Sequence, residues 1–217
     1  MKHVIEVCVL AVGLTMCGCA APKSTSRSAS SHASTNAAPQ DPALRREILA
    51  MCEQDQKARK DFSPDMPQKR AIAMRELDER NTARMKEIIA KHGWPGVRLV
   101  GKDGANAAWL LVQHATHDLN FMEQCLALMS ESVKDGDASA TDLAYLTDRV
   151  RVHEGKPQIY GTQFKFAPNG SLIAEPIEDE ANVDARRKIL GLPSMAEYEK
   201  VLKEVYGKSS KPPVNNH

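Results

Sequence analysis

Apolar residues recur at helical spacing over most of this chain. Asp41-Pro42 is a typical helix start, because a capping side chain is followed by proline in the first helical turn. The spacing predicts a helix from there to about Lys60. Its apolar face is predicted to consist of Leu44, Ile48, Met51 and Cys52.

Ser63-Pro64 repeats this start signal and predicts a second, long helix that ends near His92, before Gly93 and Pro95. The apolar stripe of this helix is predicted to be Ile72, Leu77, Met85, Ile88 and Ile89. Its charged residues are predicted to form a solvated face: Arg75, Glu76, Asp78, Glu79, Arg80, Arg84, Lys86 and Glu87.

The middle of the chain predicts three further helices. Residues 105–112 are apolar on all sides, which is typical of a central, buried helix. A helix over about 119–133 follows. Ser139 and Asp142 resemble a capping box that opens a helix reaching at least Val150.

The period changes after Gly155. Aromatic residues over 159–166, a turn at 168–170 and a return over 172–174 predict a short β-hairpin. Asn182 is predicted to cap a helix ending at Gly191, and Ser194 with Glu197 predicts a last helix to Tyr206. The predicted fold is mainly α: a single helical domain over 41–206 with one short β-hairpin.

The N-terminus predicts export. An apolar run from Val4 to Met16 is too short to span a bilayer and ends at Gly18-Cys19, which fits lipoprotein processing. We therefore expect a lipoprotein signal peptide over 1–18, a palmitate-type lipid on Cys19 and a flexible linker over 19–40. The alternative is plain secretion after cleavage behind Ala20 or Ala21.

The predicted signal peptide indicates where the protein is located and what it contacts. Residue 20 is not Asp, so nothing favours retention at the inner membrane, and we expect an outer-membrane lipoprotein facing the periplasm or the cell surface. The membrane is then a partner through the lipid anchor. A formal charge of +1 supplies no strong field for nucleic acid, which export also argues against. Residues 207–217 are predicted to be a disordered tail.

Two cysteines, Cys52 and Cys125, lie in the predicted folded part. In an oxidising compartment they would be able to form a disulfide. The alternative is a pair of buried thiols that pack as small apolar groups, because both lie on predicted apolar helix faces.

The first candidate functional segment is the polar stretch 113–118, at the end of the most apolar helix. If the helix continues, His114, His117 and Asp118 lie on one face, and Asp118 orients His114 or joins it in binding a metal. Gln113 would then contact substrate. Alternatively the helix ends near Ala115, Asp118 caps the next helix and His114 is a hydrogen-bonded core residue.

Two more segments carry polar groups. Asp148 and Arg149 together suit an acidic or amide-bearing ligand, or else a structural ion pair between helix and hairpin. In the strand predicted over 158–163, Gln158, Tyr160 and Gln163 offer hydrogen bonds to a polar substrate. In the alternative, the hairpin packs through Tyr160 and Phe164, and the two glutamines lie at its rim.

Several enzyme classes lack their motifs in this sequence. There is no Gly-x-Ser-x-Gly turn, no His-Glu-x-x-His and no Walker-type phosphate loop. No cofactor and no metal is predicted; a metal site through His114 and Asp118 is a weaker alternative without evident further ligands unless His153 joins it.

The chain resembles a bacterial family known as domain of unknown function 6624. The resemblance covers about 85–192 and consists of ordered motifs at 93–95, 113–118, 146–150 and 155–163, with a similar stretch at 182–192. The family carries no assigned activity, so the resemblance implies no reaction. It implies that one pattern unites Gln113, His114, Asp118, Asp148, Arg149, Gln158, Tyr160 and Gln163.

The sequence supports two functional hypotheses. In the first, the protein is an envelope enzyme in which His114 is the general acid or base on a polar peptide or glycan, oriented by Asp118 or Asp148. Arg149 and the polar strand hold the substrate. In the second, the protein is a non-catalytic periplasmic binding module that uses the same polar pocket.

Overall fold

The computed structural model describes residues 6–7, 38–60, 66–167 and 170–206. Several predictions lie outside these ranges: the signal peptide except residues 6–7, Cys19 and the linker up to residue 37, the start signal at Ser63-Pro64, the turn residues 168–169 and the tail over 207–217. Within the described ranges the fold is mainly α with a short antiparallel hairpin, as predicted.

Three long helices open the domain. Helix α1 (Pro42–Arg59) begins as predicted, with the Asp41 side chain accepting a hydrogen bond from the amide of Leu44. Helix α2 (Gln68–His92) begins later than predicted, after Pro67, and ends at Gly93, where φ is 72°. Helix α3 (Val97–Gln113) is kinked at Gly101.

The remaining helices also begin next to their predicted capping residues, although the Asn182 side chain makes no capping hydrogen bond. Helix α4 is Leu119–Lys134 and α5 is Ala140–His153, and their first turns are capped by Asp118 and Ser139. A 3-10 turn over Glu180–Asn182 leads into α6 (Val183–Ile189). Helix α7 (Met195–Tyr206) closes the domain.

Ion pairs show how the first three helices run. Arg84 of α2 pairs with Glu47 of α1, and Arg59 pairs with Asp78, so α1 and α2 are antiparallel. Arg45 bonds to Asp103 at one end of α1, and residue 55 contacts residue 114 at the other, so α1 and α3 are parallel. Gly104 lies at this contact, where a Cβ would lie 3.4 Å from Arg45 of α1 and 2.9 Å from Val100 of its own helix.

The sheet is smaller than the sequence suggests. Strand β2 (Phe164–Phe166) pairs with β3 (Leu172–Ala174), which confirms the hairpin but shortens its first strand. Residues 158–163 are irregular instead, with φ +67° at Gly161. Strand β1 (Glu6–Val7) adds to the other edge of β2 and was not predicted. Cleavage before Cys19 would remove it.

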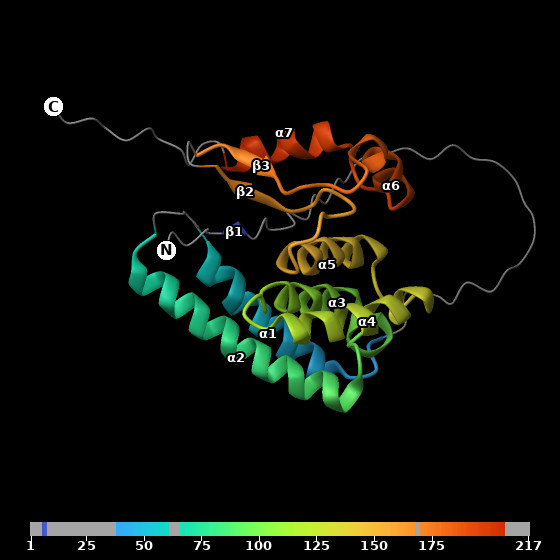
Figure 1. Cartoon of the computed structure of the whole chain (residues 1–217). Coiled ribbons are helices and arrows are strands. Elements are labelled where there is room, and N and C mark those ends of the chain that lie inside the picture. The colour runs from blue at the N-terminus through green and yellow to red at the C-terminus, as the bar shows by residue number, and fades with distance from the viewer. Residues whose placement is uncertain (1–5, 8–37, 61–65, 168–169, 207–217) are drawn as a thin grey trace, which may run out of the picture.

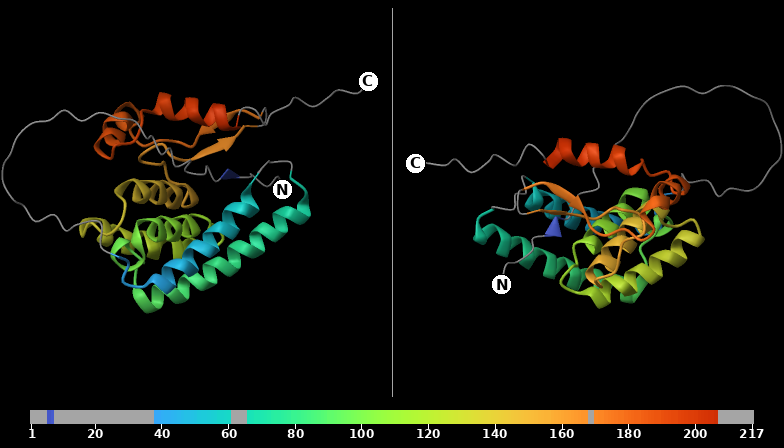
Figure 2. Two further views of the ribbon diagram at one scale, coloured as in Figure 1. Left: turned by 180° about the vertical axis from the view of Figure 1, so that it is seen from behind. Right: turned by 45° about the horizontal axis from the view of Figure 1, so that its top comes forward.

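The elements stack in layers, which Figure 1 shows and the two views in Figure 2 confirm. Helices α1 and α2 form one side, α3 lies against them, and α4 lies beside α3 and α5. Helix α5 lies between this group and a top layer made of the sheet, α6 and α7. No helix among the described residues has the length and apolar character needed to cross a membrane.

Two predictions about the second helix are wrong. Ile72 is half exposed rather than part of the apolar stripe. Asp78 is not on the solvated face, since its side chain is only 14% exposed and bonds to Arg59. Near Ile72 the half-buried apolar positions are Ala71, Met74 and Leu77, so Ile72 lies off the inward face of α2.

The two cysteines of the described domain are free thiols, not a disulfide. Burial raises the pKa of Cys52 to about 11 and that of Cys125 to about 12. Both side chains therefore pack as uncharged groups, and neither is an activated nucleophile.

Candidate functional site

His114 lies where α3 ends. The helix stops at Gln113 and His114 is its C-cap, so residues 114, 117 and 118 do not share a helix face. The Asp118 carboxylate caps α4 by accepting from the amide of Phe121 and pairs with Lys86. Its pKa is lowered, chiefly by the hydrogen bond from Lys86. The structure thus places Asp118 in the capping role that the sequence left open, and His117 is exposed.

The carboxylate beside His114 is that of Asp55, 59 residues earlier in the chain. Nδ1 of His114 lies 3.0 Å from Oδ1 and 2.9 Å from Oδ2 of Asp55. The Asp55 side chain is fully buried and that of His114 is 2% exposed. A buried carboxylate at one ring nitrogen fixes the orientation of the imidazole.

Two further residues hold Asp55. Arg59, one turn later on α1, lies 2.6 Å from Oδ1 of Asp55 and also 2.6 Å from Oδ1 of Asp78 on α2. We call Asp55, Arg59, Asp78 and His114 the histidine cluster. It joins the end of α1, the first half of α2 and the end of α3.

The histidine cluster has a net charge that one additional proton would neutralise. Two carboxylates and one guanidinium sum to −1 with neutral His114, and to zero once the imidazole is protonated. Burial works to raise the pKa of Asp55, but the hydrogen bond and charge of His114, with Arg59 and Gln56, outweigh it, and the pKa is lowered. Burial raises the pKa of Asp78 despite Arg59.

The sequence carried a signal for this cluster that pattern reading missed. The inward stripe of α1, with Leu44 and Ile48 buried, continues at helical spacing to Asp55 and Arg59, which are also buried. A charged pair on a core stripe points to a buried polar site. Asp78 lies the same way on α2, followed one turn later by buried Asn81 and Thr82.

A second polar cluster surrounds Asp148 of α5, which is fully buried. Its carboxylate accepts from the backbone N–H groups of Ile159, Tyr160 and Thr162 and from the Thr162 hydroxyl, at 2.7 to 3.1 Å. Burial raises the pKa of Asp148 against the opposing effect of these bonds. Because four donors converge on the carboxylate, segment 158–163 bends around it instead of extending β2.

The carbonyl side of the same segment faces two arginines of α6. Arg186 donates to the carbonyl of Ile159 at 2.8 Å, and Arg187 donates to that of Tyr160 at 2.6 Å. Arg187 is fully buried, which lowers its pKa. A carboxylate on the N–H side and guanidiniums on the C=O side hold this backbone from both sides.

The predicted substrate-binding glutamines have different surroundings. Gln158 is fully buried: its Nε2 donates to the carbonyls of Gln163 and Glu175, and its Oε1 accepts from the amide of Gln163. Gln163 donates from Nε2 to the Thr162 hydroxyl at 2.8 Å. Gln158 is therefore a structural bridge, and Tyr160 is half-buried beside it.

The three predicted polar segments do meet, at the end of α3. Asp148 binds the third segment, and Arg149 donates to the carbonyl of Gln113 in the first at 3.2 Å. Helices α3 and α5 run parallel there, which is shown by three matched contacts. These contacts pair Asn106 with Asp142, Trp109 with Tyr145 and Gln113 with Arg149.

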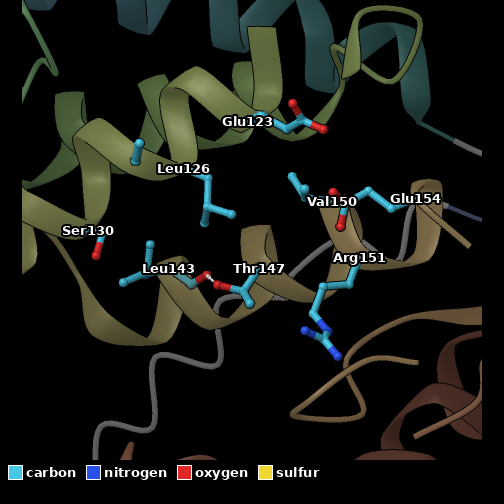
Figure 3. A pocket seen from close by; sticks show the side chains of 9 residues that line it. Glu123, Leu126, Ser130, Leu143, Thr147, Val150, Arg151 and Glu154 are labelled. Atoms are coloured by element: carbon cyan, nitrogen blue, oxygen red, sulfur yellow. Dashed lines mark hydrogen bonds between the residues drawn. The ribbon is translucent and has the colours of Figure 1, made fainter. Parts of the chain in front are cut away.

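A surface groove lies elsewhere, between α4 and α5. Its lining includes Leu126, Leu143 and the charged residues Glu123, Arg151 and Glu154, whose side chains Figure 3 shows. Arg151 is already bonded to the carbonyl of Pro157 and to Glu178. None of the predicted site residues lines this groove, so it is separate from both polar clusters.

The histidine cluster is also the group whose ligand atoms best suit a metal. Among the described residues, one ligand atom each of Asp55, Asp78 and His114 lie within 4.8 Å of one another. However, Arg59 already bonds to one oxygen of each carboxylate and compensates one of their two negative charges. A divalent cation would have to compete with this buried guanidinium for the same carboxylates.

Comparison with known proteins identifies a family and nothing closer. No curated protein and no solved structure gives a significant match to the chain. The family model described as Family of unknown function (DUF6624) matches residues 42–211, which extends beyond the motifs at 93–192 and takes in α1 with Asp55. The chain belongs to the Family of unknown function (DUF6624).

Proposed function

We propose that this protein is an enzyme of the cell envelope in which His114, oriented by Asp55, is the general acid or base. The observation that carries this proposal is the buried contact of 3.0 Å between Nδ1 of His114 and Oδ1 of Asp55. Since Nδ1 is tied to the carboxylate, proton exchange with a substrate falls to Nε2.

The rest of the histidine cluster supports the same chemistry. Arg59 and Asp78 hold Asp55 in place, so the imidazole keeps one orientation through the reaction. The cluster becomes neutral when it gains a proton, so the low dielectric of the site does not oppose a charged imidazole. The substrate class that the envelope offers is a polar peptide or glycan.

The test compares turnover by wild type and by His114→Gln, with peptidoglycan fragments as substrates and mass spectrometry as the readout. We expect wild type to form a product and the variant to lose a factor of about 100 to 10,000 in rate, as for removal of a general acid or base. Asp55→Asn should lose rate as well, because the ring then lacks its orienting carboxylate. Melting temperatures serve as the control for folding.

Two results would overturn the proposal. If wild type and His114→Gln bind a fragment equally and neither forms product, the protein is a binding module. If Zn²⁺ or Mn²⁺ stabilises wild type but neither Asp78→Asn nor His114→Gln, the trio of ligand atoms holds a metal and His114 does not carry the proton.

The envelope location is part of the proposal and rests on the leader. We expect cleavage before Cys19 and lipidation of that cysteine, with the domain held on the linker over 19–40. Mass spectrometry of the chain purified from membranes should give the mass of a lipidated chain from residue 19, and Cys19→Ser should abolish that mass. An unmodified chain beginning after Ala20 or Ala21 would contradict lipidation and support plain secretion.

A further inference from the structure

The two most buried of the predicted substrate-binding glutamines have opposite hydrogen-bond states. Gln113 is 3% exposed and Gln158 is fully buried. All polar atoms of the Gln158 amide have partners within the protein. By contrast, neither Nε2 nor Oε1 of Gln113 has a hydrogen-bond partner among the described residues. The buried Gln158 amide therefore stabilises the fold through its hydrogen bonds, whereas the buried Gln113 amide makes none with the described residues.

A second unused group lies one turn before Gln113. Trp109 is on the same face of α3, at i and i+4, and its buried Nε1 also has no partner among the described residues. This face meets α5, where the Trp109 ring packs edge-on against Tyr145 and the Gln113 carbonyl accepts from Arg149. The face thus combines an aromatic wall, one indole donor and an amide with a donor and an acceptor.

The presence of a buried amide at Gln113 and a buried indole N–H at Trp109, both without hydrogen bonds to the described residues, calls for an explanation. A buried amide that makes no hydrogen bond destabilises the fold, and native proteins rarely keep one without a ligand or an ordered water. An apolar side chain of the same size would be the more stable choice. Retention of the amide is typical of a residue that serves binding at a cost in stability.

We infer that Gln113 and Trp109 recognise an amide edge of the substrate, in which an N–H and a C=O point the same way. A primary amide or a lactam presents this edge, and it pairs with the Gln113 side chain through two N–H···O bonds at once. A carboxylate or phosphate only accepts, so it leaves Oε1 of Gln113 facing negative charge. A hydroxyl satisfies one Gln113 atom at a time. The Trp109 indole adds a donor to the ligand carbonyl.

This inference rests on the proposed function for its place next to His114, the residue after Gln113. It gives the reaction a substrate class: a polar molecule bound through a primary amide or lactam, with the proton exchanged at the neighbouring imidazole. Binding of the amide is nevertheless separable from proton exchange, because His114 contacts Asp55 of α1, while the Gln113 face meets α5.

The first test uses one substitution at two positions. Gln113→Met keeps the length of the side chain and removes the unused amide, so the melting temperature of the full chain should rise by about 3 °C. Gln158→Met removes three satisfied bonds, and its melting temperature should fall by about 6 °C or more. Equal destabilisation by both variants would show that Gln113 is structural and would overturn the inference.

The second test measures binding of small probes to the full chain by NMR. Acetamide and 2-pyrrolidinone carry the required edge, whereas N,N-dimethylacetamide and acetate lack the N–H. We expect the first two to shift the side-chain ¹⁵N–¹H₂ signals of Gln113 with millimolar affinity, and the other two to leave them unchanged. Gln113→Met, which also assigns those signals by their loss, should abolish probe-dependent shifts at the Trp109 indole.

The outcomes separate this inference from the proposed function. Acetamide binding that persists in His114→Gln supports the amide site even if the acid–base role fails. Absence of binding to wild type, or equal effects of acetamide and N,N-dimethylacetamide, overturns the amide site. The turnover test on His114 is not affected by that result.

Discussion

Asp148→Ala should lower the free energy of unfolding by about 4–6 kcal/mol, because three N–H groups of segment 158–163 lose their buried acceptor together. The Thr162 hydroxyl loses its acceptor as well. A loss of this size approaches the whole stability of many domains. Urea unfolding at neutral pH, followed by circular dichroism, measures it.

A matched control lies on the same helix. The Asp142 carboxylate has side-chain hydrogen bonds with Asn106, at 3.3 Å, and with Ser139, so Asp142→Ala should cost about 1–2 kcal/mol. Asp148→Asn retains one acceptor oxygen and should fall between the two variants. If Asp148→Ala costs no more than Asp142→Ala, the carboxylate is not what holds segment 158–163.

Asp55→Ala should cost about 3–5 kcal/mol, since removal of one partner leaves the other charges of a buried cluster uncompensated. Arg59 loses one of its two carboxylates and His114 loses the contact at Nδ1. The control is Asp103→Ala, which breaks the exposed pair of Asp103 with Arg45, also on α1, and should cost about 1 kcal/mol or less.

The difference between Asp55→Ala and wild type should depend on pH in one direction. The pKa of Asp55 is lowered in the folded state, so its stabilising effect is fully present above the unfolded-state pKa of about 3.9. It is lost as the pH falls below that value and through the folded-state pKa. The difference in free energy of unfolding between wild type and Asp55→Ala should therefore be equal at pH 7 and pH 5 and smaller at pH 3, and an equal difference at all three would contradict an ionised Asp55.

These two aspartates change the roles that the sequence suggests. Asp148 was expected to orient His114 or to hold substrate, but its carboxylate is occupied by the backbone of 159–162. The carboxylate at His114 is Asp55 instead. Among the predicted site residues, Asp148 and Gln158 hold the segment, Asp118 caps a helix, and His114 and Gln113 remain for the proposed chemistry.

The fold was predictable to the extent that it is local. Helix starts at Asp41, Asp118 and Ser139 depend on a side chain and an amide three residues apart, which any reading of the sequence can find. The run over 105–112 predicted a core helix because it is apolar on all sides. Segment 158–163 was wrongly predicted to be a strand. Its residues alternate as in a strand, but its N–H groups donate to Asp148, which lies on helix α5 and is not visible from the local pattern.

The sequence by itself determined the helices, their caps, the hairpin and which segments are rich in polar groups, because spacing within one helix or strand fixes these features. Only the tertiary structure decided which polar groups meet. Asp55 reaches His114 because α1 packs parallel to α3, and Arg59 reaches Asp78 because α2 folds back on α1. The register of packed helices depends on all their contacts at once, so a pair 59 residues apart leaves no spacing in the sequence to reveal it.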